Sequence, residues 1–243
     1  MKFLKNLPEV ARAREIQMRT PPQRARYLRL CTQHITKMDG LSMVAGYGLS
    51  ELIRHLLNDA LPTDATDTYG STPLHEAASY GHAETVDVLL GWDGAIDTLD
   101  VNLKTPLYLA VTHAREAVVL QLLKHGANPD ELCLDHWTAL HKAADEGNRS
   151  LVQMLLDHGA SIRAQSARGL IPLHRAAGRG WLDIMKLLVD KGSPIDAISY
   201  DGWTPLHGAS SSGQHEAVKL LLRNNAAINF QSIDGVTRRC SST

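Results

Sequence analysis

The chain contains 243 residues with a net charge of −1, and 44% of them are apolar although only two are Phe. A chain of this length and apolar content can bury a core and form one or two domains. No apolar run approaches the roughly 20 residues that a membrane-spanning helix needs, and the first eight residues lack the apolar segment of a secretion signal. Three widely spaced cysteines, Cys31, Cys133 and Cys240, argue against a disulfide framework or a zinc site. We therefore expect a cytoplasmic protein, with the nucleus as the alternative.

Charge is unevenly distributed along the chain. Residues 1–37 contain nine Lys or Arg against two Glu, a balance of +7, whereas the remainder has a balance of −8. We expect residues 1–36 to form a basic helical flank that packs on the acidic remainder through Tyr27, Leu28, Cys31 and Ile35. The alternative, which we do not favour, is an arm that binds nucleic acid or an anionic membrane.

A tetrapeptide close to Thr-Pro-Leu-His recurs every 33 residues. Its copies begin at Thr72, Thr105, Thr138, Ile171 and Thr204, with no insertion between them. A strict period means that each unit repeats one supersecondary structure and buries its apolar face against its neighbours. The period therefore predicts a stack of similar units.

The unit from Gly70 to Asn102 shows how one repeat is expected to fold. Thr72 can cap a helix whose first turn holds Pro73, where the missing N–H of proline has no intrahelical partner to lose. Gly81 predicts the end of this helix, because glycine enters the left-handed conformation freely. Apolar spacing then predicts a second helix over about 83–90. Each unit is thus a pair of helices followed by an irregular segment.

These features resemble the ankyrin repeat. The resemblance is carried by the pattern T-P-L-H-x-A-A at 72–78 and by the turns Gly126-Ala127 and Gly159-Ala160. It covers about residues 37–235 and implies an all-α solenoid of about six helix-turn-helix units, whose hairpin loops project at about a right angle and border a groove. We place this ankyrin-repeat domain at 37–234, with repeats at 37–69, 70–102, 103–135, 136–168, 169–201 and 202–234.

Some positions depart from the common pattern. In the repeat at 103–135, Leu103 and Ala114 replace glycines and Tyr108 replaces the histidine. We expect this repeat to be the least protected from amide exchange. Asp93 and Asn225 also stand where other repeats have glycine, and both residue types tolerate positive φ better than most.

The last residues begin a seventh unit that the chain does not complete. Gly235-Val236-Thr237 matches the start of a repeat, but Arg238-Arg239-Cys240 falls where Pro-Leu-His belongs. We therefore expect 235–243 to be the truncated start of a seventh repeat of a longer array. Several apolar side chains of the sixth repeat would then lack a cover: Leu206, Ala209, Val218, Leu221 and Leu222.

No motif indicates catalysis, a metal or a cofactor. His75, His141, His174 and His207 occupy one repeat position, so neighbouring copies lie roughly 10 Å apart, one packed helix away, and cannot share a metal ion. The ankyrin resemblance suggests instead that they hydrogen-bond the first-turn Thr and neighbouring backbone. The chain also lacks a phosphate-binding loop, a nucleophile elbow and a zinc-protease helix. The sequence therefore predicts a protein that is not an enzyme.

The resemblance implies that a protein partner binds at the hairpin tips and the exposed end of each first helix. Within these positions, Trp137, Leu170 and Trp203 share one register and should form an apolar stripe; the alternative is that each Trp packs on the next hairpin. Trp92 and Trp181 map to other turns and are expected to pack. The candidate partner-binding residues are Tyr69, Tyr80, Lys104, His113, Asp135, Trp137, Glu146, Arg168, Leu170, Arg179, Tyr200 and Trp203.

Several functions remain open at this point. The favoured one is a non-catalytic scaffold or adaptor that binds protein partners in the groove and takes no small-molecule substrate. A second is the repeat fragment of a larger multidomain signalling protein, since residues 47–53 resemble the start of repeat arrays in large fungal signalling proteins. A third is a substrate receptor of a ubiquitin ligase that lacks its C-terminal box. A fold alone cannot decide between them.

Overall fold

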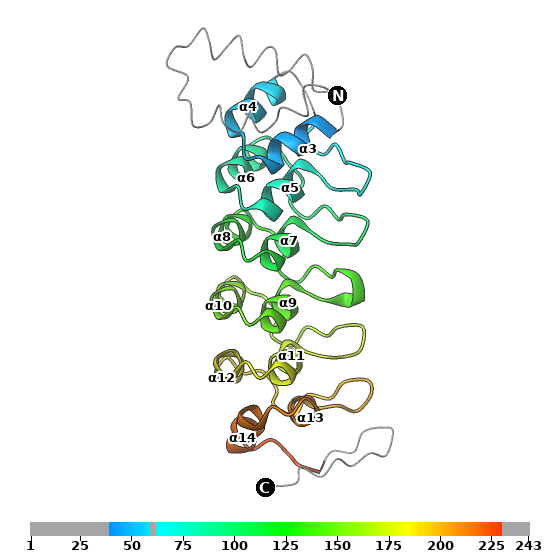
Figure 1. Ribbon diagram of the computed structural model, residues 1–243, viewed down its shortest axis with the longest axis vertical. Coiled ribbons are helices and arrows are strands. Elements are labelled where there is room, and N and C mark those ends of the chain that lie inside the picture. Colours follow the sequence, from blue (N-terminus) through cyan, green and yellow to red (C-terminus); the bar gives the residue numbers. More distant parts are fainter. Residues whose placement is uncertain (1–38, 59–61, 230–243) are drawn as a thin grey trace. The chain divides into compact units, whose positions relative to one another are not determined.

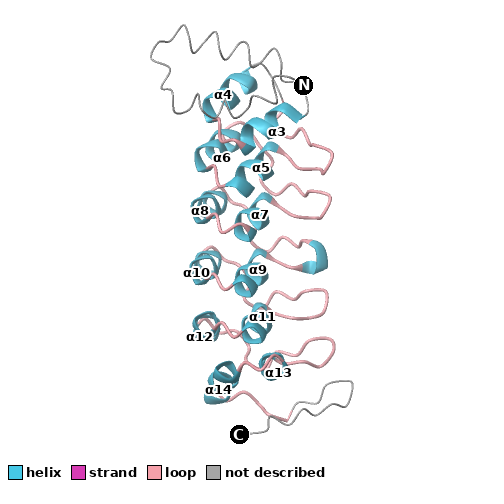
Figure 2. Ribbon diagram, in the orientation of Figure 1, coloured by secondary structure: helices cyan, strands magenta, loops and turns pink. Residues whose placement is uncertain are grey.

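The computed structural model describes residues 39–58 and 62–229. The predicted basic flank at 1–36 and the predicted seventh-repeat start at 235–243 lie outside these residues. The chain divides between Ala127 and Asn128 into two compact units, which we call unit 1 and unit 2. In the described residues all regular structure is helical, with no strand (Figure 2). None of these helices is long and apolar enough to cross a membrane.

Unit 1 contains three helix pairs, one in each of the first three predicted repeats. The first helices α3, α5 and α7 pack on one another in sequence, and the second helices α4, α6 and α8 form a parallel row (Figure 1). Their bounds are α3 (Asp39–Gly46), α4 (Ser50–Asn58), α5 (Pro73–Tyr80), α6 (Ala83–Leu90), α7 (Pro106–Thr112) and α8 (Glu116–Lys124).

Unit 2 has the same construction. The first helices α9, α11 and α13 form one row, and the second helices α10, α12 and α14 form the other (Figure 1). A 3-10 turn, η2, precedes the first pair. The bounds are η2 (Leu134–His136), α9 (Ala139–Glu146), α10 (Arg149–Asp157), α11 (Pro172–Arg179), α12 (Leu182–Asp190), α13 (Pro205–Ser211) and α14 (His215–Arg223).

The ends of the first helices follow from the recurring tetrapeptide. The Thr72 hydroxyl accepts the His75 N–H, and Pro73 occupies the first helical position, as predicted. Gly81 ends α5 in the left-handed conformation with φ 86°. The predicted second helix over 83–90 matches α6. Similar caps recur at Thr105, Thr138 and Thr204.

The core of each unit consists of the repeated leucines and small residues between the two rows. Leu74, Leu107, Leu140 and Leu173 are at most 1% exposed. The paired alanines that follow, such as Ala77 and Ala78, are fully buried. Small side chains here let neighbouring first helices approach closely. This packing carries most of the helical stability, because helices this short are marginal in isolation.

The expectation of an uncovered sixth repeat is wrong for most of its apolar residues. Leu206, Ala209 and Leu221 are at most 3% exposed. The reason is that α13 packs against both α11 and its own partner α14, so these side chains are covered by the preceding repeat and by their own helix pair. Val218 and Leu222 are half-buried.

The degenerate repeat at 103–135 adopts left-handed backbone without glycine. Leu103 has φ 56° and Ala114 has φ 53°. Asp135 and His136, in the following turn, have φ 63° and 56°. This conformation is energetically unfavourable for an L-residue with a Cβ. Positive φ was also predicted for Asp93 and Asn225, and the structure confirms it with 58° and 64°.

The hairpin loops are held by hydrogen bonds within each loop and between neighbours. In unit 1, Asp67 Oδ1 accepts the N–H groups of Tyr69 and Ser71, both at 2.8 Å. In unit 2, the Ser166 hydroxyl takes the same role for Arg168 and Leu170. Backbone bonds then join one loop to the next: Val101 N–H to Tyr69 O, Ala167 N–H to Asp135 O and Tyr200 N–H to Arg168 O.

Candidate functional site

The repeat histidines fix the residues at the base of each hairpin. In unit 2, His141 Nε2 donates to the carbonyl of Leu170 at 2.8 Å, and His174 Nε2 donates to that of Trp203 at 3.0 Å. The other ring nitrogen of each accepts a backbone N–H from Thr138 or Ile171. Because a carbonyl can only accept, the proton sits on Nε2. The predicted structural role of these histidines is confirmed.

Burial keeps these imidazoles neutral. Desolvation lowers the pKa of His75 and His174 below the ordinary value, although backbone carbonyls oppose this by stabilising the charged form. Desolvation also lowers the pKa of His141 to about 4. At neutral pH they therefore act as uncharged clamps, with the second ring nitrogen free to accept from the backbone.

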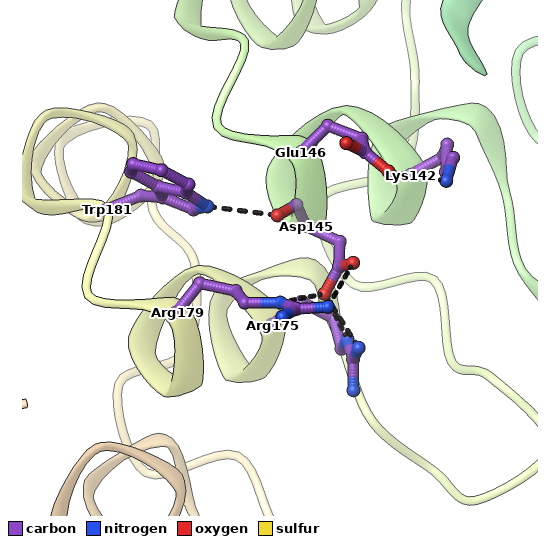
Figure 3. Close-up of polar contacts among 6 residues, drawn as sticks. All are labelled: Lys142, Asp145, Glu146, Arg175, Arg179 and Trp181. Carbon is purple, nitrogen blue, oxygen red and sulfur yellow. Dashed lines mark hydrogen bonds and ion pairs between the residues drawn. The ribbon is translucent and has the colours of Figure 1, made fainter. Parts of the chain in front are cut away.

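A shared ion pair joins the first helices α9 and α11 (Figure 3). Asp145 Oδ1 accepts from Arg175 Nη2 at 2.6 Å and from Arg175 Nε at 3.0 Å. Arg179 donates to both oxygens of the same carboxylate, each at 3.0 Å. The side chain of Asp145 is only 9% exposed, whereas that of Arg179 is 56% exposed. One carboxylate thus positions two guanidinium groups.

The electrostatics of this cluster leave a positive excess. Burial alone would raise the pKa of Asp145, but the hydrogen bonds and charges of Arg179 and Arg175 outweigh it and lower that pKa. The hydrogen bond and charge of Asp145 in turn raise the pKa of Arg179. Asp145 is therefore ionised at neutral pH, and two positive charges share one negative charge. The neighbouring Lys142 and Glu146 pair with each other at 2.6 Å and add no net charge (Figure 3).

Two tryptophans border the cluster. The Arg175 guanidinium carbon lies 4.7 Å from the centre of the Trp137 ring, within the range of a cation–π contact. Trp181 Nε1 donates to the Asp145 carbonyl at 2.9 Å (Figure 3). A Cβ on Gly147 would lie only 2.6 Å from the Trp181 ring, so the indole covers that glycine. Trp181 therefore packs as expected, and Trp137 is covered on one face by Arg175.

The contact made by Trp181 has counterparts in unit 1. His82 Nε2 donates to Gly46 O at 2.8 Å, and Arg115 Nε donates to Ser79 O at 3.0 Å. Each donor lies 36 residues after its acceptor, like Trp181 and Asp145. This position was not recognised from the sequence, because a His, an Arg and a Trp share only their ring or guanidinium N–H.

An open hollow of about 220 Å³ lies between the last two repeats of unit 2. Three predicted contact residues, Arg168, Leu170 and Trp203, meet there, although they come from two hairpins. Arg168 Nη2 bonds Asp201 Oδ2 at 2.7 Å while its side chain stays 72% exposed. The complete lining is Arg168, Leu170, His174, Arg175, Gly178, Ser199, Trp203, Gly208, Ser211 and Ser212.

We call the groove face of unit 2 the surface formed by this hollow, the Asp145 cluster and Trp137. It contains five of the predicted contact residues: Trp137, Arg168, Leu170, Arg179 and Trp203. Glu146 lies beside it and is exposed. Asp135 and Tyr200 belong to the hairpins, where Asp135 O accepts from Ala167 and the Tyr200 ring packs over Gly169.

The predicted contact residues of unit 1 are more dispersed. Tyr69 is 69% exposed at a hairpin tip. Tyr80 is 57% exposed and stacks on His82 with ring centres 6.4 Å apart. Lys104 is half-buried and its carbonyl accepts from His75, while His113 is exposed at the end of α7. They lie at a hairpin tip, at the end of α5, at a hairpin base and at the end of α7.

Sequence reasoning missed Arg175, Gly178 and Gly208 on the groove face, together with the serines Ser199, Ser211 and Ser212 of the hollow. A signal for Arg175 was present, because it stands four residues before Arg179 and two residues at that spacing share a helix face. The glycines gave no such signal. Within the described residues no group of three potential ligands could hold a metal ion.

Repeated helix pairs with left-handed glycine ends and hydrogen-bonded hairpins define an α-helical repeat protein. The family model of ankyrin repeats (three copies) matches residues 41–133, 95–166 and 140–232, so the chain belongs to the ankyrin-repeat family. Among solved structures, the human ASB11 ankyrin repeat domain is similar with a TM-score of 0.72 and 25% identity, covering 81% of this chain and 88% of that chain. No curated protein sequence matches the chain. Ankyrin repeats are in general non-catalytic modules for protein–protein interaction.

Proposed function

We propose that this protein is a non-catalytic adaptor that binds a protein partner on the groove face of unit 2. The observation that carries the proposal is the meeting of Trp203, Leu170 and Arg168 at one open hollow beside the Asp145 cluster. Tryptophan and arginine are enriched among the residues that dominate binding energy. These side chains are half-buried or exposed, so each retains surface for a partner.

The groove face is held in place before any partner arrives. The backbone of Trp203 is fixed on both sides, since its N–H donates to the Ser199 hydroxyl at 3.0 Å and its carbonyl accepts from His174. Arg175 and Arg179 are held by Asp145. A surface that is already ordered loses less conformational entropy when it binds, which favours affinity.

Proximity labelling in cells with the full chain tests this proposal. The set of labelled proteins is compared between wild type, Trp203→Ala and the matched control Trp92→Ala, which removes another half-exposed tryptophan, one that follows α6 in unit 1. We expect a partner that is lost with Trp203→Ala and kept with Trp92→Ala. The purified partner should then bind the wild type directly in calorimetry. Partners that are unaffected by Trp203→Ala, Trp137→Ala and Arg168→Ala would disprove the proposal.

A different observation would support each of the alternatives. Elongin and cullin components among the partners would support a ubiquitin-ligase receptor. A catalytic domain encoded by a longer transcript would instead support the multidomain signalling protein. Binding of nucleic acid that weakens steeply with salt and disappears without residues 1–36 would support a basic arm.

A further inference from the structure

Two glycines on the groove face lie in helices without a backbone reason to be glycine. Gly178 belongs to the last turn of α11 and Gly208 to the middle of α13. Neither has the positive φ that marks the turn glycines of the chain. Glycine is less favourable than other residues in a helix because it loses more freedom on folding. Something other than local backbone geometry must explain these two residues.

Close packing does not explain them either. A Cβ on Gly208 would lie 3.6 Å from its nearest neighbour, the carbonyl oxygen of His174, and one on Gly178 would lie 3.9 Å from the Ser212 hydroxyl. Both are ordinary contact distances. At the register of Gly208 the other repeats carry the long side chains of Arg175, Lys142, Leu109 and Glu76.

What the two glycines create is the hollow of about 220 Å³, since both line it. One water occupies roughly 30 Å³ of liquid, so this space holds a whole side chain. Its walls combine two chemistries. Leu170 and Trp203 supply apolar surface, while Arg168 and Arg175 supply guanidinium groups, and no carboxylate is among the lining residues that the structure describes.

The charge balance around the hollow selects an anion. Arg175 shares the single carboxylate of Asp145 with Arg179, so this cluster keeps a net positive charge. Arg168 pairs with Asp201, but both side chains are at least half exposed and the pair is open to competition from a second carboxylate. An occupant with an aliphatic stem and a negative end matches both walls.

We propose that this hollow is a specificity subsite for an acidic side chain, Glu or Asp, of a bound peptide segment. The stem of that side chain packs against Leu170 and Trp203, and its carboxylate meets Arg168 and Arg175. The inference rests on the proposed function, because it names the side chain that the groove face selects. Guanidinium groups recognise carboxylates through paired, charge-assisted hydrogen bonds, which supply the specificity.

The test is a selection of random peptides displayed on phage against the full chain. Three proteins are used: the wild type, Gly208→Leu, which fills the hollow, and Ser150→Leu, which places the same side chain on the exposed face of α10. Leu109 stands at the register of Gly208 in the repeat at 103–135, and leucine favours helix, so Gly208→Leu should fold and melt no lower than the wild type.

We expect the wild type and Ser150→Leu to select peptides enriched in Glu or Asp beside an apolar residue. Changing that Glu to Gln in a synthetic peptide should weaken binding about tenfold or more, and Gly208→Leu should weaken it equally. Peptides without acidic enrichment, or whose binding survives both changes, would overturn the subsite. If such peptides still lose binding with Trp137→Ala, which lies outside the hollow, the proposed function stands. If no peptide depends on Trp137 or Gly208, both proposals fail.

Discussion

Unit 1 and unit 2 repeat the same helix pair but present different groove residues. Their buried positions are nearly interchangeable, as the fully covered Leu74 and Leu140 show. In unit 1, however, the predicted contact residues include the exposed Tyr69 and Tyr80, whereas in unit 2 the Asp145 carboxylate joins Arg175 and Arg179 across two repeats. Packing of the stack therefore constrains only the positions between helices. The groove positions are left to vary, and specificity can be built in one unit alone.

The largest expected effect is on the pH dependence of stability and comes from a feature that both units share, the buried neutral histidines. In the folded chain the pKa of His141 is about 4, against 6.5 when it is unfolded. Between these values only the unfolded chain binds the proton. The contribution of His141 to the free energy of unfolding is therefore fully present above pH 6.5 and is lost as the pH drops toward 4. At 1.36 kcal/mol per unit, His141 alone accounts for about 3 kcal/mol. The lowered pKa values of His75 and His174 act in the same direction.

Urea unfolding of the wild type and of His141→Gln between pH 8 and pH 4 measures this. Gln does not titrate in this range, so the variant should lose less stability than the wild type as the pH falls, by about 3 kcal/mol over the whole range. Both proteins should show little change between pH 8 and pH 7, which serves as the internal control. Equal losses for the two proteins would show that the pKa of His141 is the same in the folded and the unfolded chain.

The next largest effect should come from the ion pairs of Asp145, which belong to unit 2. Asp145→Ala leaves the guanidinium groups of Arg175 and Arg179 without their carboxylate. Breaking a buried pair is costly, but both arginines keep contact with water, so we expect a loss of about 2 kcal/mol in the free energy of unfolding. The control is Glu146→Ala, next to it on α9, which removes the i,i+4 pair between Glu146 and the partly buried Lys142 and should cost under about 0.5 kcal/mol. Urea titration measures the free energy of unfolding of both variants. Similar small losses for the two would contradict a structural role for Asp145.

A smaller effect should come from the irregular repeat of unit 1. Leu103 and Ala114 are exposed and have positive φ, so Leu103→Gly and Ala114→Gly remove backbone strain without losing a buried side chain. Strain relief exceeds the extra entropy of an unfolded glycine, and each variant should gain about 1 kcal/mol. Gly81→Ala is the reverse control and should destabilise, because its Cβ would lie 2.8 Å from the Arg115 side chain.

Hydrogen exchange followed by mass spectrometry locates the same effect. In the wild type we expect residues 103–127 to exchange faster than the repeats on either side, because local stability limits protection. The variant that carries both glycine substitutions should slow exchange there. If 103–127 is already the best protected segment of the wild type, the strained positions do not weaken this repeat.

Much of the fold was predictable because it depends on residues close in sequence. The cap at Thr72, the helix over 83–90 and the left-handed end at Gly81 all follow from neighbours within one repeat. The groove face was harder, because Asp145 meets Arg175 and Arg179 from 30 and 34 residues away. The repeat period shows which positions are adjacent, but it does not show how long side chains pair.

The same limit applies to the apolar stripe that was predicted from the sequence. Register alone placed Trp137, Leu170 and Trp203 in one row. It could not show that Arg175 covers Trp137, nor that Gly208 leaves a hollow beside Trp203. A glycine in the sequence indicates a hollow only when the residues around it are known, and these are known only from the folded chain.

The smallest effect on stability should come from the most exposed pair of the groove face. Arg168 and Asp201 lie 2.7 Å apart, but their side chains are 72% and 50% exposed, so water competes with the pair and salt screens it. Arg168→Ala, Asp201→Ala and the double variant should each change the free energy of unfolding by under about 0.5 kcal/mol. The two single variants should differ in partner binding, however: Arg168→Ala removes a guanidinium group that lines the hollow, whereas Asp201→Ala removes its competing carboxylate and should strengthen binding of an acidic peptide. A double-mutant cycle that instead shows strong coupling in stability would mean that Arg168 holds the hairpins together rather than facing a partner.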